Sequence, residues 1–493
     1  MTTWEQTFAL AGGEGLPLFL RIARAIADDV RRGRLKPGAA LPSSRGLSGS
    51  LGVHRNTVLA AYSELIAEGW VETKRRGGTY VSSSLPDERP RRFARQAVTR
   101  AAIPARPGFD LATPLEPAEI VTPLLAGTIS LAGGAPDVRL APAAALARAY
   151  RRALRPASAR SVLAYGDERG LPRLRRALAS MLSPLRGLAA DEHSVMVTRG
   201  SQMALDLTAR ALIAPGDVVA VESFGYRPAW NALRAAGARL VPIAVDGDGL
   251  RVDELAALVT RERVRAVYVT PHHQFPTTVT LAPGRRLQLL DLARSHRLAI
   301  IEDDYDFEFH YDGRPVLPLA SADASGQVVY IGTLSKLLAP GLRVGFVVAP
   351  PALVERLALL RRAIDRQGDQ AVESAVAELI EEGELARHAR RARLAYHARR
   401  DALIEALAAQ PALASGLEIV VPSGGMALWA RAAIDVDAWA ERAVKELVAI
   451  TTARRYSFDG RSRPFVRLGY AGHDERELRE AARRLAAAWS ARR

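Results

Sequence analysis

Residues 332–343 read GTLSKLLAPGLR, and this stretch decides the fold class of the larger part of the chain. Lys336 is one of only four lysines among 68 basic residues, so its place inside this motif is informative. Thr333, Ser335 and Arg343 surround it with two hydroxyls and a fixed cation, which suit a phosphate dianion. An amine beside phosphate-binding groups is what pyridoxal phosphate requires, because its aldehyde forms an imine with a lysine. The motif therefore predicts Lys336 as a Schiff-base lysine.

The same cofactor needs an acid facing its ring nitrogen, and one apolar strand ends in candidates for that role. Residues 298–301 are apolar, and Glu302, Asp303, Asp304 and Tyr305 follow them. Strand ends are where α/β sheets present ligands. An aspartate there can keep the ring nitrogen protonated, and Tyr305 can reach the ring hydroxyl. Taken alone, this motif is better explained as an ordinary polar strand end.

Two earlier segments offer a phosphate site and an aromatic face. Residues 198–202, TRGSQ, follow a strand and open a helix, so backbone N–H groups and the Ser201 hydroxyl can hold a phosphate. Residues 222–226, ESFGY, place an aromatic side chain after the next strand, where it can stack on the cofactor ring. Each signal is weak by itself.

The wider pattern predicts a multi-domain chain. Strand-like segments at 195–198, 218–221, 266–270 and 299–302 alternate with helices, which indicates an α/β domain with a mostly parallel sheet. A proline-bearing stretch that lacks periodicity precedes this domain and predicts a linker. We predict a DNA-binding domain over 1–82, the linker over 83–127 and the large domain over 128–493, whose last part, from about 365 to 493, is a smaller C-terminal α+β subdomain.

The first 82 residues have the pattern of a winged helix-turn-helix. A helix over 17–30, a short one before Gly52 and a third over 55–68 precede two strand-like segments with a basic tip between them. A helix-turn-helix inserts the start of its second helix into the major groove of DNA. The predicted contacts with bases and phosphates are Ser44, Arg45, Arg55, Asn56 and Thr57, with Lys74, Arg75 and Arg76 at the tip of the wing.

Both regions resemble known families. Residues 41–81, LPSSRGLSGSLGVHRNTVLAAYSELIAEGWVETKRRGGTYV, resemble the winged-helix domain of GntR-type regulators. Further on, LAGGAPDVRLAP, YGDERGLPRLRRALA, TRGSQMALDL, TPHHQFP, IEDDYDFEF, GTLSKLLAPGLRVGF and PSGGMALWA follow one another as in the MocR subfamily. This resemblance implies a small α+β winged helix-turn-helix fused to a large α/β, fold-type I, aminotransferase-like domain that binds pyridoxal phosphate.

The resemblance also implies roles for single residues. Lys336 resembles the imine lysine, Asp303 the partner of the ring nitrogen and Tyr305 the partner of the ring hydroxyl. Tyr226 resembles the stacking aromatic and Arg467 the arginine that binds a carboxylate, although Arg467 is as readily explained as structural. The phosphate positions are Ser201, Gln202, Ser335 and Arg343, with Tyr165 as the tyrosine lent to the neighbouring subunit's phosphate.

Three positions depart from the family pattern. His54 stands where a serine usually caps the recognition helix, and histidine is a poor cap. Gln274 opens a segment that replaces the usual Asn-Pro-Thr-Gly, and it is the candidate to replace the asparagine at the ring hydroxyl. Phe224 stands where a proline is common, which leaves open whether Phe224 or Tyr226 covers the ring.

Composition limits the remaining function classes. The chain has 493 residues and no cysteine, so disulfides and thiolate metal sites are excluded, and we expect no metal site. A net charge of +15 fits a nucleic-acid partner but is also explained by an arginine-rich composition. Neither a secretion signal nor an apolar run long enough for a membrane span is evident, so we expect a cytoplasmic protein.

These observations predict a one-component transcription regulator. Its large domain would bind pyridoxal phosphate and sense an amine or amino acid, and a head-to-tail homodimer would place two heads on an operator. One alternative is a catalytically active aminotransferase that carries a DNA-binding head. A second is a sensor of pyridoxal phosphate itself.

Overall fold

The computed structural model describes residues 16–74, 77–86, 106–110, 124–313 and 315–490. These residues form two compact units that divide near residue 111, and each is described by itself. Arg75, Arg76 and most of the predicted linker over 83–127 lie outside the described residues.

The N-terminal unit is a winged helix-turn-helix. Its elements are α1 (Leu18–Arg31), α2 (Ser44–Leu51), α3 (Arg55–Ala67) and the antiparallel strands β1 (Val71–Thr73) and β2 (Thr79–Val81). Gly52 ends α2 with a φ of 64°, which glycine adopts without strain and which makes the tight turn into α3. Ile22, Ile26, Val58 and Leu65 close a small core between α1 and α3.

A seven-stranded sheet forms the centre of the second unit. Its order is β4 (Val195–Thr198), β12 (Gly345–Val348), β11 (Val328–Thr333), β10 (Ala299–Asp304), β9 (Val264–Val269), β5 (Val218–Glu222) and β6 (Arg239–Ile243). Strand β12 is antiparallel to both neighbours, and the other adjacent pairs are parallel. The predicted α/β domain with a mostly parallel sheet is therefore confirmed.

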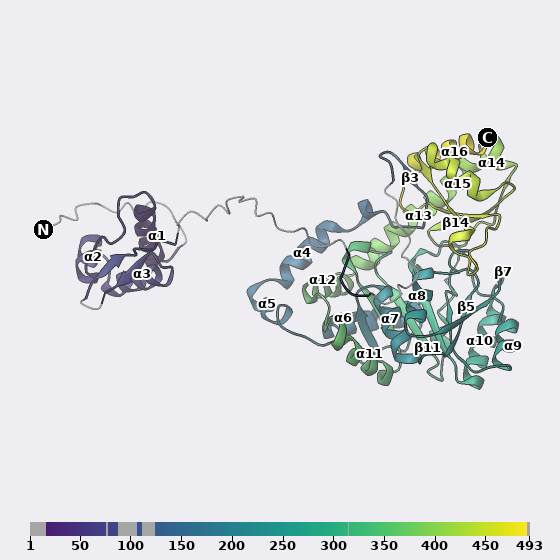
Figure 1. Ribbon diagram of the computed structural model, residues 1–493, viewed down its shortest axis with the longest axis horizontal. Coiled ribbons are helices and arrows are strands. Elements are labelled where there is room, and N and C mark those ends of the chain that lie inside the picture. The colour runs from purple at the N-terminus through teal and green to yellow at the C-terminus, as the bar shows by residue number, and fades with distance from the viewer. Residues whose placement is uncertain (1–15, 75–76, 87–105, 111–123, 314, 491–493) are drawn as a thin grey trace. The chain divides into compact units, whose positions relative to one another are not determined.

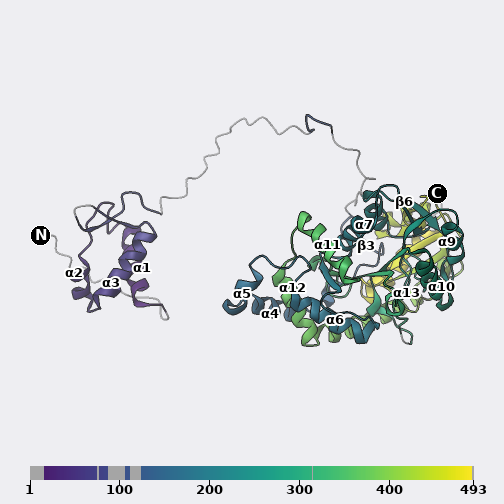
Figure 2. The ribbon, with the colours of Figure 1, turned by 90° about the horizontal axis from the view of Figure 1, so that it is seen from below.

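Helices cover both faces of this sheet because successive strand residues point to opposite faces. Val219 and Val221 pack with α7 (Ser201–Leu212), α8 (Arg227–Ala235) and α11 (Pro351–Ile364). Val218 and Ala220 pack with α9 (Val252–Val259) and α10 (Pro283–His296), which lie side by side in Figures 1 and 2. The remaining elements of this part are α4 (Ala143–Ala153), α5 (Pro156–Val162), α6 (Pro172–Arg186), α12 (Gln370–Glu381), β7 (Val245–Asp246) and β8 (Gly249–Leu250).

The C-terminal part forms a smaller α+β layer, drawn in yellow-green in Figure 1. Its antiparallel sheet has the order β13 (Leu417–Ile419), β14 (Ala427–Ala432), β17 (Phe465–Gly469) and β16 (Thr451–Thr452). The long helix α13 (Glu384–Ala408) leads into it, followed by α14 (Pro411–Ala414), α15 (Val436–Lys445) and α16 (Glu475–Ser490). Strand β3 (Ile129–Ser130) pairs with β15 (Val448–Ala449) and so ties residues near 130 to this layer. Among the described residues, no helix is both long and apolar enough to cross a membrane.

Candidate cofactor cavity and DNA-binding surface

A cavity lies at the carboxyl ends of the parallel strands, where α/β sheets bind ligands. Most of the predicted cofactor residues meet there, joined by residues from the loop near 133 and from β17. The lining residues are Gly133, Gly134, Ser201, Tyr226, Tyr268, Thr270, Phe275, Asp303, Tyr305, Thr333, Ser335, Lys336, Pro340, Arg343 and Arg467.

Lys336 follows β11 and places its amine in this cavity. Its Nζ donates a 3.3 Å hydrogen bond to the Gly134 carbonyl. Burial and the nearby Arg467 cation lower the pKa of Lys336, against the opposing carboxylates of Asp306 and Asp303. A lowered pKa increases the share of the neutral amine, which is the nucleophilic form.

Asp303, near the end of β10, presents a buried oxygen that has no hydrogen-bond partner in the described ranges of the chain. Tyr268 donates a 2.8 Å hydrogen bond to its Oδ2, whereas its Oδ1 is buried and unpartnered. Burial, together with the neighbouring carboxylates of Asp304 and Asp306, raises the pKa of Asp303 to about 7 against the hydrogen bond from Tyr268. A buried acceptor without a donor is costly, and a protonated ring nitrogen would satisfy it.

The opposite end of the cavity offers hydrogen-bond donors. The hydroxyl of Ser335 is buried and has no partner among the described residues. Ser201 begins α7, where backbone N–H groups are exposed to a ligand. Arg343 lies so close to Gly200 that a Cβ at residue 200 would come within 2.7 Å of its Nη2 atom. Gly200 also has a φ of 75°, a backbone conformation that favours glycine. Hydroxyls, helix N–H groups and a cation are a donor set that suits a phosphate.

Arg467 on β17 puts a second buried cation at the cavity. Only 1% of its surface is exposed, and its Nη1 donates a 2.6 Å hydrogen bond to the Pro276 carbonyl. Its guanidinium also lies 4.6 Å from the centre of the Phe275 ring. An arginine fixed in this way can offer its remaining N–H groups to a carboxylate.

The N-terminal unit exposes its predicted DNA contacts. Arg55 and Asn56 are exposed at the start of α3, and Thr57 is half-buried beside them. Arg55 Nε donates a 3.3 Å hydrogen bond to the hydroxyl of Ser44. Arg45 and Lys74 are exposed too, with the Lys74 amine 4.8 Å from the centre of the Tyr80 ring. Arg75 and Arg76, at the wing tip, lie outside the described residues.

Comparisons with known proteins decide the family. The model for class I and II aminotransferases matches residues 127–485, and the model for bacterial regulatory proteins of the gntR family matches residues 18–81. The probable rhizopine catabolism regulatory protein MocR of Rhizobium meliloti is 34% identical over 97% of this chain and 94% of its own length. The chain belongs to the MocR-like regulators.

Two further proteins agree with this assignment. The transcriptional regulator TauR of Rhodobacter capsulatus is 32% identical over 98% of this chain and 99% of its own length. The α-aminoadipate aminotransferase LysN of Thermus thermophilus, solved in complex with N-(5'-phosphopyridoxyl)-L-leucine, is 30% identical, with a TM-score of 0.68 over 74% of this chain and 93% of its own. The predictions of the MocR subfamily, the fold-type I domain and pyridoxal phosphate as its cofactor are confirmed.

Three predicted cofactor residues do not line the cavity of this MocR-like chain. Gln274 Nε2 donates 2.7 Å hydrogen bonds to the carbonyls of Phe224 and Phe275, and its Oε1 accepts a bond from Thr277, so the amide is held between its own loop and the loop that follows β5. Gln202 Nε2 donates to the Pro228 carbonyl instead. Tyr165 is 82% exposed, with the Arg366 guanidinium 4.6 Å from the centre of its ring.

The structure also resolves the two other departures from the family pattern. Tyr226 lines the cavity, whereas Phe224 packs edge-on against Trp429 with ring centres 5.8 Å apart. Contrary to expectation, His54 does cap α3, because its Nδ1 accepts a 3.2 Å hydrogen bond from the Asn56 backbone N–H. Tyr268, Thr270 and Phe275 also line the cavity, although none of them was predicted as a site residue.

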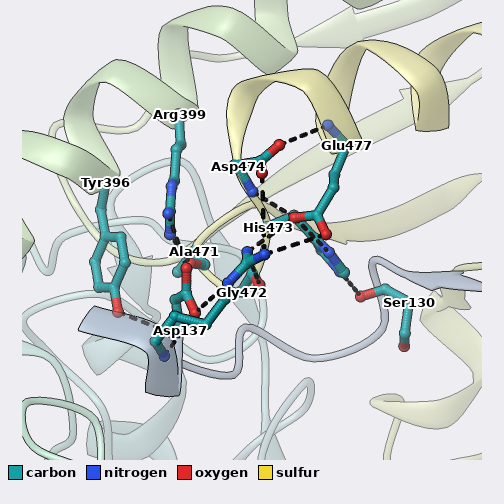
Figure 3. Close-up of polar contacts among 10 residues, drawn as sticks. Ser130, Asp137, Tyr396, Arg399, Ala471, Gly472, His473, Asp474 and Glu477 are labelled. Carbon is teal, nitrogen blue, oxygen red and sulfur yellow. Dashed lines mark hydrogen bonds and ion pairs between the residues drawn. The ribbon is translucent and has the colours of Figure 1, made fainter. Parts of the chain in front are cut away.

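A polar network outside the cavity holds the loop that carries Gly133 and Gly134 (Figure 3). Asp137, next along this loop, accepts hydrogen bonds from Arg139 at 2.9 Å and from Arg399 of α13 at 2.8 Å. Burial alone would raise the pKa of Asp137, but these hydrogen bonds bring it below its ordinary value. Arg139 also donates to Glu477 of α16 at 2.9 Å. The loop is thereby tied to two helices of the C-terminal part.

Proposed function

We propose that this chain is a DNA-binding transcription regulator whose aminotransferase-like domain holds pyridoxal phosphate and senses an amine or amino acid. The observation that carries the proposal is one cavity lined by a buried amine, Lys336, an unpartnered acceptor, Asp303 Oδ1, and an unpartnered hydroxyl, Ser335. When bound, pyridoxal phosphate supplies an aldehyde that condenses reversibly with primary amines.

The residues of the cavity divide between the parts of the cofactor. Lys336 would hold it covalently, Asp303 would keep the ring nitrogen protonated, and Tyr226 would lie against the ring. Tyr305, whose hydroxyl now donates to the His273 carbonyl at 2.9 Å, is placed for the ring hydroxyl. The phosphate group would be bound by Ser201, Thr333, Ser335 and Arg343.

The amine ligand would be recognised through its carboxylate. Arg467 is the buried cation that lines the cavity from β17, so an amino acid would gain an ion pair that a simple amine lacks. A ligand biases DNA binding only if it has different affinities for two arrangements of the protein. Tyr165, exposed on its own chain, is the residue we assign to the cavity of a second copy in a head-to-tail homodimer.

The test uses the full chain loaded with pyridoxal phosphate and DNA from upstream of its own and neighbouring genes. Amino acids and amines are added singly while fluorescence anisotropy follows DNA binding. We expect one class of amine to change the DNA affinity at least fivefold. Lys336→Ala should lose the visible absorbance of the bound cofactor and the response to the amine, while its affinity for DNA in the absence of an amine stays the same.

Two results would favour other functions. Rapid, complete transamination of an amino acid with a keto acid, without any effect on DNA binding, would make the chain an aminotransferase with a DNA-binding head. A full change in DNA binding when pyridoxal phosphate alone is added to cofactor-free protein would make it a sensor of the cofactor.

A further inference from the structure

Three histidine rings meet beyond the cavity, where β9 and β10 end side by side. One ring nitrogen from each of His272, His273 and His310 lies within 4.8 Å of the other two. His272 and His273 are only 4% and 1% exposed, and their ring centres are 4.3 Å apart. None of the three rings lines the cofactor cavity. They form a separate group, which we call the histidine cluster.

The hydrogen-bond partners of the rings indicate where their protons lie. His310 Nε2 lies 2.7 Å from the Asp312 carbonyl, which can only accept, so Nε2 carries the proton and Nδ1 holds a lone pair. His273 Nδ1 lies 2.9 Å from Asp306 Oδ1, and with Asp306 as a carboxylate the lone pair of His273 is on Nε2. His272 has no partner on either nitrogen among the described residues, so one of its two nitrogens also holds a lone pair.

These lone pairs are buried and have no donor. His273 Nε2, His310 Nδ1 and both nitrogens of His272 are all buried without a hydrogen-bond partner in the described part of the chain. A neutral imidazole binds a metal ion through such a lone pair. One water molecule has only two protons to donate, fewer than the acceptors that meet here.

The surroundings supply negative charge as well. Asp306 Oδ2 and Asp304 Oδ1 are buried beside the cluster, and neither has a hydrogen-bond partner among the residues that the structure describes. The nearby cation Arg186 is itself engaged by Glu308, Tyr330 and Asp304. An added cation would therefore meet unpaired carboxylate oxygens as well as imidazole lone pairs.

We propose that His272, His273 and His310 bind one divalent transition-metal ion, for which zinc is the best match to three imidazole ligands. Asp306 is then the carboxylate that orients the metal-bound His273 through their hydrogen bond. Zinc–nitrogen bonds of roughly 2.0–2.1 Å place ligand atoms about 3.4 Å apart, so the rings close in by about 1 Å when the ion binds.

The ion would have a structural role. His310 forms a β-bridge with Gly424, and the Gly425 N–H donates a 2.7 Å hydrogen bond to the Phe309 carbonyl. Residues 422–425 lead into β14, whereas His272 and His273 follow β9. A bound metal would thus fasten the strand ends that carry Asp303 to the segment that enters the C-terminal layer.

The test measures metal on the full chain after removal of any purification tag and treatment with a chelator. Equilibrium dialysis against Zn²⁺ is followed by elemental analysis, and Co²⁺ serves as a visible probe of ligand number. We expect about one ion per chain, at least 100-fold weaker binding in His272→Ala and His310→Ala, and unchanged binding in His193→Ala, whose side chain is 64% exposed. Asp306→Asn should weaken binding about 10- to 100-fold.

Two outcomes would overturn the proposal. One is the absence of stoichiometric Zn²⁺ or Co²⁺ on the unsubstituted chain, a measurement that does not depend on whether the variants fold. The other is one bound ion that survives in both histidine variants, which would then be adventitious. Lys336→Ala should keep the metal, so failure of the metal site and failure of the cofactor assignment are seen separately.

Discussion

The two units of the chain use their charged residues in opposite ways. The N-terminal unit exposes Arg45 and Arg55, which pack against little of their own chain. The cofactor cavity buries Asp303, Ser335 and Arg467, and it leaves Asp303 Oδ1 and the Ser335 hydroxyl without a partner among the described residues. Exposed charged residues for DNA binding lower the stability of their unit little, because water still solvates them. A preformed cavity with buried polar atoms destabilises its domain until the ligand binds.

The largest effect is expected for Arg467, the buried cation of the cofactor cavity. Arg467→Lys keeps the charge but loses the planar fork that meets a carboxylate with two hydrogen bonds. We expect the response of DNA binding to amino acids to need about 100-fold more ligand. The response to a matching amine that lacks the carboxylate should stay the same, as should the cofactor spectrum. An equal loss for both ligands would mean that Arg467 only supports the cavity.

A substitution on the DNA-binding surface should reduce DNA affinity by a smaller factor and leave the cofactor cavity unchanged. Arg55→Ala removes an exposed cation from the start of α3 and should weaken binding to the specific DNA at least tenfold, by about 1–3 kcal/mol. Arg24→Ala, which removes an exposed cation from α1, is the matched control and should cost less. Competition with unrelated DNA measures specificity. If Arg55→Ala kept its full affinity for the specific DNA, Arg55 would not be one of the residues that recognise DNA.

A pH series tests whether the cavity destabilises the cofactor-free protein. Asp303 has an ordinary pKa of 3.8 when unfolded and about 7 when folded, so the folded state binds more protons between these values. Its contribution to stability is complete below about pH 4 and is lost as the pH rises through 7. Asp303→Asn cannot ionise, so its cofactor-free form should be about 1–3 kcal/mol more stable than the unsubstituted chain at pH 8.

Urea unfolding of the cofactor-free protein at pH 5 and pH 8 measures this difference. The gain in Asp303→Asn should shrink toward pH 5, and the same variant should bind pyridoxal phosphate more weakly. Asp291→Asn, at a position whose side chain is 70% exposed, is the control and should change stability equally at both pH values. A gain that does not depend on pH would contradict the idea that a buried carboxylate destabilises the cavity.

The same contrast explains what the sequence could predict. A short apolar run located β4 at 195–198, where all four residues are buried, and helical periodicity began α3 at Arg55. The motif residues Lys336, Asp303 and Ser201 line the cavity because the ends of parallel strands meet at one edge of the sheet.

Residues placed by tertiary contacts escaped prediction. Tyr268 lies inside an apolar strand and resembles a core residue until the sheet register brings its hydroxyl to Asp303. The Gln274 amide was assigned to the ring hydroxyl, but its hydrogen bonds to the carbonyls of Phe275 and of the distant Phe224 decide where it points. His272 and His310 lie far apart in the sequence, so no ligand spacing indicated the histidine cluster.

The smallest expected effect concerns the cap of the recognition helix, where sequence and structure differed. His54 Nδ1 accepts the Asn56 N–H, so His54→Ala should destabilise the start of α3 by about 0.5–1 kcal/mol. His54→Ser should restore or exceed the original stability, because a serine hydroxyl caps well. Hydrogen exchange of the first amides of α3 in the full chain measures this loss locally. If exchange is the same in His54→Ala and the unsubstituted chain, the histidine does not act as a cap in solution.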